Sequence, residues 1–192
     1  PTSGVRVKSV NINGISHTFP GDIDMLLQAP NGSNVILMSD RGGGGDLVNA
    51  NFVFDDAALS LLPTANITSG TYRPTNVAGP DNFPAPGPGS VNQLNPSLAN
   101  FTGNFNGDWK LFVNDQVGGD VGAITSWSIT FEVNGAVWTP VTGLFTDANA
   151  LVPYVAGTMA STVYAKPTTT TAYNAVRSTA TCTSGTGTST VT

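Results

Sequence analysis

Aspartate is the residue type in this chain with the most capacity for chemistry, and it recurs at the ends of the expected strands. The set of interest is Asp22, Asp24, Asp46, Asp55 and Asp56. The first two are separated by one apolar residue and therefore share one face of an expected strand. Calcium takes roughly six to eight oxygen ligands from carboxylates, backbone carbonyls and waters on loops. We therefore predict a calcium site made from these aspartates, and no other cofactor.

Two further observations bear on that prediction. The chain has no EF-hand spacing, so the ligands would come from segments distant in the sequence. Asp115 and Asp120 lie in a glycine-containing turn and form a second candidate set. Aspartate also hydrogen-bonds the amides of turns without any metal, and that interpretation stands beside the calcium one.

Nucleophilic catalysis has few candidates. A Ser-His-Asp mechanism needs a histidine that carries the proton, and His17 is the single histidine of the chain. Neither a G-x-S-x-G elbow nor an H-E-x-x-H motif occurs. Cys182 is the single cysteine and has no basic neighbour, so we expect a small buried apolar side chain there. Glu132 is the single glutamate, which leaves no evident acid pair for glycoside hydrolysis. The sequence predicts a protein that is not an enzyme.

Composition and charge exclude other classes. The formal net charge is −5 and lysine and arginine form no cluster, so the chain lacks the basic surface that binds nucleic acid. No apolar run approaches the ~20 residues of a membrane-spanning helix. Only 10% of residues are charged, while Gly, Pro, Asn, Ser and Thr are abundant, which favours an all-β fold. A chain of 192 residues is long enough for two domains.

Hydrophobic patterning places the strands. Side chains of residues 23–28 fall on two alternating faces, one of them apolar, and residues 35–38 form a continuous apolar run. The alternation of apolar and polar side chains is most regular over residues 126–133. Asn13 and Gly14 predict a turn. The proline-rich stretch 79–89 predicts a surface loop that is ordered where Phe83 docks, and Asp55 is placed to cap a helical turn.

Two sequence blocks carry a resemblance to a known family. The first runs from His17-Thr18 through Gly21-Asp22 and an alternating strand to Pro30-Asn31-Gly32. The second contains Asn106-Gly107-Asp108-Trp109-Lys110-Leu111, a Gly-Asp turn and Trp127-Ser128-Ile129. Together they resemble the P domain, or Homo B domain, that follows the catalytic domain of proprotein convertases and recurs in bacterial secreted proteins. The resemblance implies a jelly-roll-like domain over residues 1–134 and favours bound calcium.

Residues 135–192 show a second resemblance. The chain becomes rich in threonine, alanine and valine, with Trp138-Thr139-Pro140, Thr142-Gly143-Leu144 and a late cysteine. These features resemble the small immunoglobulin-like repeats of bacterial surface proteins. The resemblance implies a small immunoglobulin-like β-sandwich as a second domain.

These observations favour a non-catalytic extracellular or cell-surface protein with a structural or adhesive role. The β-prone C-terminal tail suggests filaments of this chain joined head to tail through terminal strands, or contacts with other cell-surface proteins. One alternative, implied by the P-domain resemblance, is an accessory stabilising segment of a secreted subtilisin-like protease. A third is a carbohydrate-binding module, for which Tyr72, Phe83 and Trp138 are the candidate exposed aromatic residues.

Overall fold

The computed structural model describes residues 5–133, 135–177 and 185–192. The described chain is all-β, as expected, with short 3₁₀ turns as its only helical elements. No helix among these residues is both long and apolar enough to pass through a membrane. The chain divides into a larger unit, Val7–Phe131, and a smaller unit, Pro1–Arg6 with Glu132–Thr192. Cys182 and Asn134, on which the sequence analysis placed a buried side chain and a domain boundary, lie outside the described residues.

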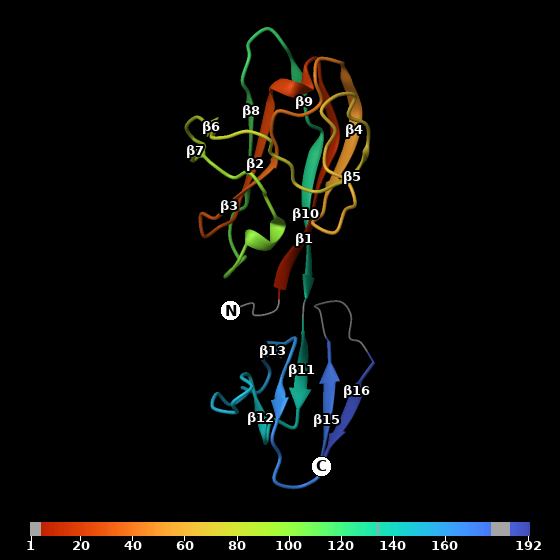
Figure 1. Cartoon of the computed structure of the whole chain (residues 1–192), viewed down its shortest axis with the longest axis vertical. Helices are drawn as coiled ribbons and strands as arrows, with labels where there is room; N and C mark the ends of the chain where they lie inside the picture. The colour runs from red at the N-terminus through yellow and green to blue at the C-terminus, as the bar shows by residue number, and fades with distance from the viewer. Residues whose placement is uncertain (1–4, 134, 178–184) are drawn as a thin grey trace. The chain divides into compact units, whose positions relative to one another are not determined.

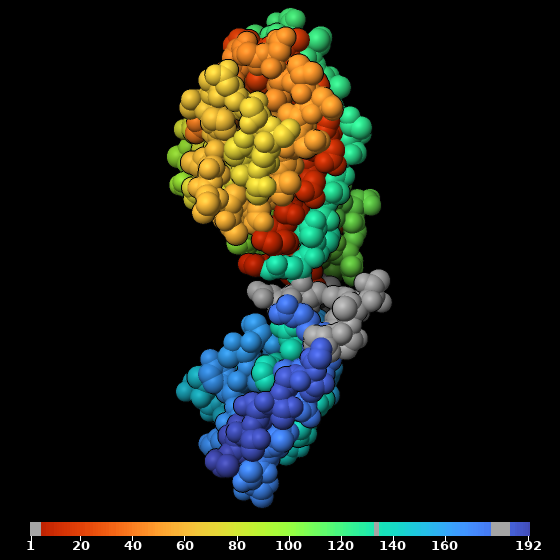
Figure 2. Space-filling view, turned by 90° about the vertical axis from the view of Figure 1, so that its right-hand side faces the viewer, coloured from red at the N-terminus to blue at the C-terminus, as the bar shows by residue number. Residues whose placement is uncertain are grey.

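The first sheet of the larger unit is built around its longest strand, β1. Its strand order is β10-β1-β4-β5, and β9 also pairs with β1. Figure 2 shows this order as neighbouring bands of teal, red, orange and yellow on one face of the unit. The strands are β1 (Val5–His17), β4 (Leu47–Phe54), β5 (Gly70–Tyr72), β9 (Gly122–Ala123) and β10 (Ser126–Val133).

The second sheet has the order β3-β2-β8, and a short hairpin, β6-β7, is also part of the unit (Figure 1). The strands are β2 (Ile23–Gln28), β3 (Asn34–Met38), β6 (Asp81–Phe83), β7 (Gly89–Val91) and β8 (Lys110–Asp115). The 3₁₀ turn η1 (Pro20–Asp22) precedes β2, and η2 (Leu98–Asn100) follows β7. Both pairings of β2 are antiparallel, so β2 is the central strand of this sheet.

Strand β2 is buried on both faces. Residues 23–27 are all buried, including Asp24, which the alternation had placed on an acidic face. Strand β3 is buried over residues 35–38, in agreement with the strand covered on both sides that its apolar run predicts. Leu26 and Ile36 form a core cluster with Phe83. The polar group on β2 therefore lies inside an apolar core.

Three local predictions are corrected by the structure. Asn13 and Gly14 form no hairpin turn but lie inside β1, where its register with β4 shifts between Ile12 and Ile15. Gly14 has φ of +63°, so the glycine allows an irregularity within a continuous strand. Asp55 accepts the N–H of Ala57 as a capping residue would, but the turn that follows is not helical. The stretch 79–89 contains strand β6 and the start of β7, although Phe83 does dock as predicted.

The expected alternation of β10 is present. Trp127 and Ile129 are half-buried while Ser126, Ser128 and Thr130 are exposed. Phe131 is 42% exposed and still contacts Trp109, with ring centroids 5.6 Å apart. Trp109 also packs edge-on against Phe101, with ring centroids 5.0 Å apart, so its ring connects β10 to the segment that follows η2.

The smaller unit has a sheet in the order β13-β11-β15-β16 and a separate pair, β12-β14. The strands are β11 (Ala136–Thr139), β12 (Leu144–Phe145), β13 (Met159–Ala160), β14 (Tyr164–Ala165), β15 (Thr171–Val176) and β16 (Gly187–Val191). Leu144, Tyr154 and Tyr173 form its core. The Tyr173 hydroxyl donates to the Thr142 carbonyl at 2.7 Å, so this buried ring also satisfies its polar atom.

Replacing Phe83 with alanine is expected to destabilise the larger unit by about 3–5 kcal/mol, because a 1% exposed ring would leave a cavity against Leu26 and Ile36. Urea unfolding measures this difference. Val77→Ala is the control, since Val77 is 48% exposed and its truncation should change stability by less than about 0.5 kcal/mol. Equal stabilities of the two variants would contradict the anchoring role of Phe83.

Asp147 organises the loop after β12 by accepting backbone N–H groups of Val152 at 2.7 Å, Leu151 at 3.0 Å and Asn149 at 3.2 Å. These bonds, that of Val152 foremost, hold the pKa of Asp147 below its ordinary 3.8. The carboxylate therefore contributes stability above the unfolded pKa, and this contribution is lost as the pH falls through the folded pKa.

Asp147→Asn is expected to lower the unfolding temperature at neutral pH, because an amide cannot accept on both of its terminal atoms. The difference from the parent protein should shrink as the pH falls below 3.8, which thermal unfolding at a series of pH values would show. Asn149→Ala is a neighbouring control, because Asn149 bonds Asp147 through its backbone N–H. A destabilisation by Asp147→Asn that is the same at all pH values would contradict this account.

Candidate functional site

A partly buried group of polar side chains surrounds Ser39, the residue that follows β3. We call it the Ser39 cluster, and its members are Asp24, Ser39, Asp40, Asn76, Asp81 and Gln116. Asp24 is the second residue of β2, Asp81 begins β6, and Gln116 follows β8. The cluster therefore joins the central strand of the second sheet to three connecting segments.

Backbone hydrogen bonds fix these segments. The N–H of Ser39 donates to the carbonyl of Thr75 at 3.0 Å, and the N–H of Thr75 donates to Leu37 at 3.0 Å. These bonds extend the pairing of β3 to the segment that carries Asn76. The N–H of Gln116 donates to the carbonyl of Asp22 at 2.9 Å, which holds the end of β8 beside the start of β2.

Asp81 is held by two side-chain donors. The Ser39 hydroxyl donates to its Oδ1 at 2.6 Å, and Asn76 Nδ2 donates to its Oδ2 at 2.6 Å. Asn76 Nδ2 also donates to the carbonyl of Gln93 at 3.0 Å. Asp81 is 5% exposed and Asn76 is 6% exposed, so these bonds form away from solvent. Hydrogen bonds to buried charged groups are stronger than neutral ones, and these two fix the Asp81 carboxylate.

Asp24 is fully buried and only half satisfied. Gln116 Nε2 donates to its Oδ2 at 2.5 Å, while its Oδ1 has no hydrogen-bond partner. Burial foremost, together with the nearby carboxylates of Asp81 and Asp40, raises the pKa of Asp24 to about 6, against hydrogen bonds from Ser39 and Gln116 that lower it. An ionised oxygen that is buried without a donor is unfavourable, which agrees with the raised pKa of Asp24.

A second acidic group lies around His17, which is 6% exposed. The pKa of Asp22 is raised by burial and by Asp120 and Asp115, while His17 lowers it. His17 Nδ1 accepts the backbone N–H of Phe19 at 3.1 Å, so the ring proton is on Nε2, which lies 3.3 Å from Asp115 Oδ2. Both ring nitrogens of His17 thus have a partner within the fold.

The predicted calcium ligands have different surroundings in the structure. Asp24 belongs to the Ser39 cluster and Asp22 to the group around His17. Asp46 is exposed and borders a shallow cavity beside His17. Asp55 accepts from Lys8 Nζ at 2.7 Å and from the N–H of Ala57 at 2.9 Å. Within the described ranges, no three His, Cys, Asp or Glu side chains are grouped so that they could hold a metal ion.

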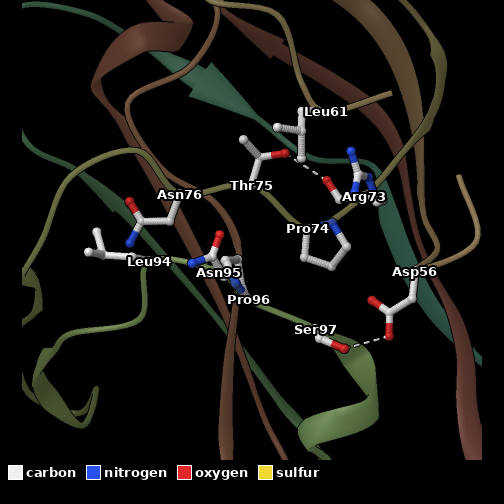
Figure 3. Close-up of a pocket in the computed structure, with 10 residues that line it drawn as sticks. All are labelled: Asp56, Leu61, Arg73, Pro74, Thr75, Asn76, Leu94, Asn95, Pro96 and Ser97. Atoms are coloured by element: carbon white, nitrogen blue, oxygen red, sulfur yellow. Dashed lines mark hydrogen bonds between the residues drawn. The ribbon is translucent and has the colours of Figure 1, made fainter. Parts of the chain in front are cut away.

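Asp56 has a capping role beside a cavity. It accepts from the Ser97 hydroxyl at 2.8 Å and from the N–H of Leu98 at 2.9 Å, at the start of η2. Figure 3 shows this contact at the edge of a cavity of about 260 Å³. The cavity is lined by Asp56, Leu61, Arg73, Pro74, Thr75, Asn76, Leu94, Asn95, Pro96 and Ser97. None of these is aromatic, so the cavity has no ring on which a sugar would stack.

The three aromatic residues considered for carbohydrate binding are engaged within the fold. Phe83 is 1% exposed, so its selection as an exposed residue was wrong. Tyr72 is half-buried and packs edge-on against Phe52, with ring centroids 6.1 Å apart. Trp138 is half-buried and its Nε1 donates to the carbonyl of Ala160 at 3.0 Å.

Sequence reasoning missed Asp40, Asp81 and the polar residues that bind them. Ser39 and Asp40 stand between a strand and a glycine run, which by itself indicates only a loop. Asp81 lies two residues before Phe83, and this spacing offered a signal: if Phe83 docks in an extended segment, Asp81 shares its buried face.

The chain matches no family model, no curated protein and no solved structure. The resemblances to P domains and to immunoglobulin-like repeats therefore rest on the sequence motifs alone.

Asn76→Ala is expected to cost about 1.5–3 kcal/mol of folding free energy, because it removes a donor from a buried carboxylate. Urea unfolding of the full chain is the measurement. Asn82→Ala is the matched control. Asn82 is exposed, and its backbone carbonyl, which the substitution keeps, accepts a hydrogen bond from Asn114 Nδ2. If both variants unfold at the same urea concentration, the Asn76 contact contributes nothing to stability.

Proposed function

We propose that the protein is a non-catalytic extracellular structural or adhesive β-protein that assembles into filaments through its terminal strand. The observation that carries this proposal is the position of β16 at the edge of its sheet. Among the described strands β16 pairs with β15 alone, over five residue pairs from Thr171–Val191 to Ala175–Gly187. No strand in the described part of the chain pairs with its other side, where backbone donors and acceptors are available to an incoming strand.

The side chains of β16 do not cover this edge. Residues 187–190 are exposed and Val191 is half-buried against the core of the smaller unit. Figure 2 shows the strand, in dark blue, uncovered on the face toward the viewer. Described residues of β16 include no Lys, Pro or acidic side chain, which are the residues that usually block edge pairing. An incoming strand would meet no repulsion there.

The assembly is proposed to be heterologous. A strand from a second copy would pair with β16 through main-chain hydrogen bonds, as in other cases of strand addition. The short strand β13 is the opposite edge of the same sheet, so one copy has two different edges available. Contacts that use two different surfaces propagate along a filament unless the geometry closes into a ring.

Other features support the non-catalytic and extracellular parts of the proposal. The single histidine has both ring nitrogens engaged, so it offers no free base. The motif resemblances favour a jelly-roll-like larger unit and an immunoglobulin-like smaller unit, both of the kind carried by secreted or surface proteins. The low content of charged residues agrees with a structural β-protein.

Two proline variants of β16 test the assembly. In an antiparallel pair, successive residues direct their N–H groups alternately toward the partner strand and away from it. Of Thr188→Pro and Ser189→Pro, one therefore removes a bond to β15 and the other alters only the open edge. We expect both variants to abolish filaments, seen by electron microscopy, and only one to lower the unfolding temperature.

The full-length chain is the reference in this experiment, at high protein concentration and with light scattering as a second measurement. Deletion of residues 186–192 should also abolish assembly. A monodisperse monomer or a closed dimer of the full-length chain would refute the filament proposal, as would filaments that persist in both proline variants.

A further inference from the structure

Arg41, in the loop between β3 and β4, carries a buried positive charge without a partner. Its side chain is 8% exposed, and its Nε is fully buried and makes no hydrogen bond. No ion pair among the described residues includes Arg41. Burying a charge is unfavourable unless the charge is paired and hydrogen-bonded. Arg41 therefore requires an acceptor that the described part of the chain does not supply.

The backbone on both sides of Arg41 is fixed. On one side, the N–H of Ser39 donates to the carbonyl of Thr75 at 3.0 Å, and on the other, the carbonyl of Gly42 accepts the N–H of Asn66 at 3.2 Å. Gly42 is itself buried. The loop cannot carry Arg41 out into solvent without breaking these bonds, so the guanidinium is held at its site with or without an anion.

A ligand can reach the guanidinium at its Nη end. Of the three guanidinium nitrogens, Nε alone is both fully buried and without a partner. The Nη atoms make no hydrogen bond to described residues either, so they are not fully buried, and the small exposed part of Arg41 includes them. A guanidinium presents its N–H groups in one plane, in an arrangement that matches the two oxygens of a carboxylate or a phosphate.

The surrounding charge favours an anion with a single charge. Asp40 directly precedes Arg41, and the loop after Arg41 is bonded to η1, where the N–H of Gly21 donates to the carbonyl of Gly43 at 3.0 Å. Asp22 is the last residue of η1, and the formal net charge of the chain is −5. Coulomb repulsion grows with the charge of the ligand, so these carboxylates oppose a doubly charged phosphate more than a carboxylate.

We propose that Arg41 binds a carboxylate group, carried by a small organic acid or by a polypeptide, through paired hydrogen bonds from its two Nη atoms. The carboxylate supplies the negative charge and the acceptors that the described residues do not provide around Arg41. The site lies in the larger unit and is independent of the filament proposal, which concerns β16 in the smaller unit.

Nuclear magnetic resonance of the full chain with isotope-labelled arginine tests the proposal, because the four arginines can be followed by their Nε–H signals. The probe is sodium propionate at neutral pH, which replaces sodium chloride at constant ionic strength. The Arg41 signal should shift and saturate, with about nine-tenths of the change complete at a concentration of about ten times Kd. At that concentration the unfolding temperature of the larger unit should rise by about 4–7 °C.

Arg41→Met identifies the Arg41 signal and removes the site, while keeping an apolar side chain in place of the arginine stem. This variant should lose the thermal shift by propionate. In chloride alone it should be at least as stable as the parent chain, because it removes an unpaired buried charge. Arg73→Met is the matched control, since Arg73 is exposed, and it should leave the response of the Arg41 signal unchanged.

Two further probes define the ligand. Sodium phosphate should bind more weakly than propionate. An aspartate residue with both backbone ends blocked distinguishes the sources of the carboxylate: binding at least as tight as that of propionate assigns the site to a polypeptide, and weaker binding assigns it to a small organic acid.

Three results would overturn the proposal. The first is an Arg41 signal that does not respond to propionate. The second is a thermal shift by propionate that persists in Arg41→Met. The third is tighter binding of phosphate than of propionate, which would mean that the site selects a different anion.

Discussion

The larger unit depends on the burial of a carboxyl group near the start of β2, the Asp24 side chain. The strand is paired on both edges, by β3 and β8, and residues 23–27 are buried on both faces. Asp24 cannot reach solvent from this position, so polar groups must come to it. Gln116 from the end of β8 and Ser39 from the end of β3 do so. The residues that follow β3 and β8 are thereby both hydrogen-bonded to one buried carboxyl group.

The same requirement explains the order of the proline-rich segment. In β6, Asp81 and Phe83 are buried and Asn82 between them is exposed. Asp81 bonds Ser39 and Asn76, while Phe83 packs against Leu26 and Ile36. One short strand therefore contributes to the polar cluster and to the apolar core, because alternate residues of a strand share a face. A segment with several prolines becomes ordered through these two side chains.

The smaller unit is stabilised differently. Its core is small, and its buried tyrosines combine apolar packing with hydrogen bonds from their hydroxyls to the backbone. Tyr173 bonds the carbonyl of Thr142, and the Tyr154 hydroxyl accepts the N–H of Trp138 at 3.0 Å. These bonds connect the loop before β12 and strand β11 to the core. Strand β16 contributes Val191 to that core, and among the described strands it pairs with β15 alone.

Local patterning was sufficient for part of this structure. The all-β class, the alternation of residues 126–130, the burial of residues 35–38 and the docking of Phe83 follow from side-chain periodicity and composition. These are properties of neighbouring residues, so the sequence by itself determined them. Asn13-Gly14 was misread because a glycine at positive φ serves a strand irregularity as well as a turn.

Only the tertiary structure decided which aspartates meet. Asp24, Asp40 and Asp81 come from three segments whose proximity depends on the pairing of β2 with β3 and on the attachment of residues 75 and 76 to the end of β3. No spacing in the sequence encodes that proximity. Asp55 and Asp56 have the same residue type and serve a turn and a helix start instead. The chemistry available to a carboxylate depends on burial and on its partners, and both are set by contacts between distant parts of the chain.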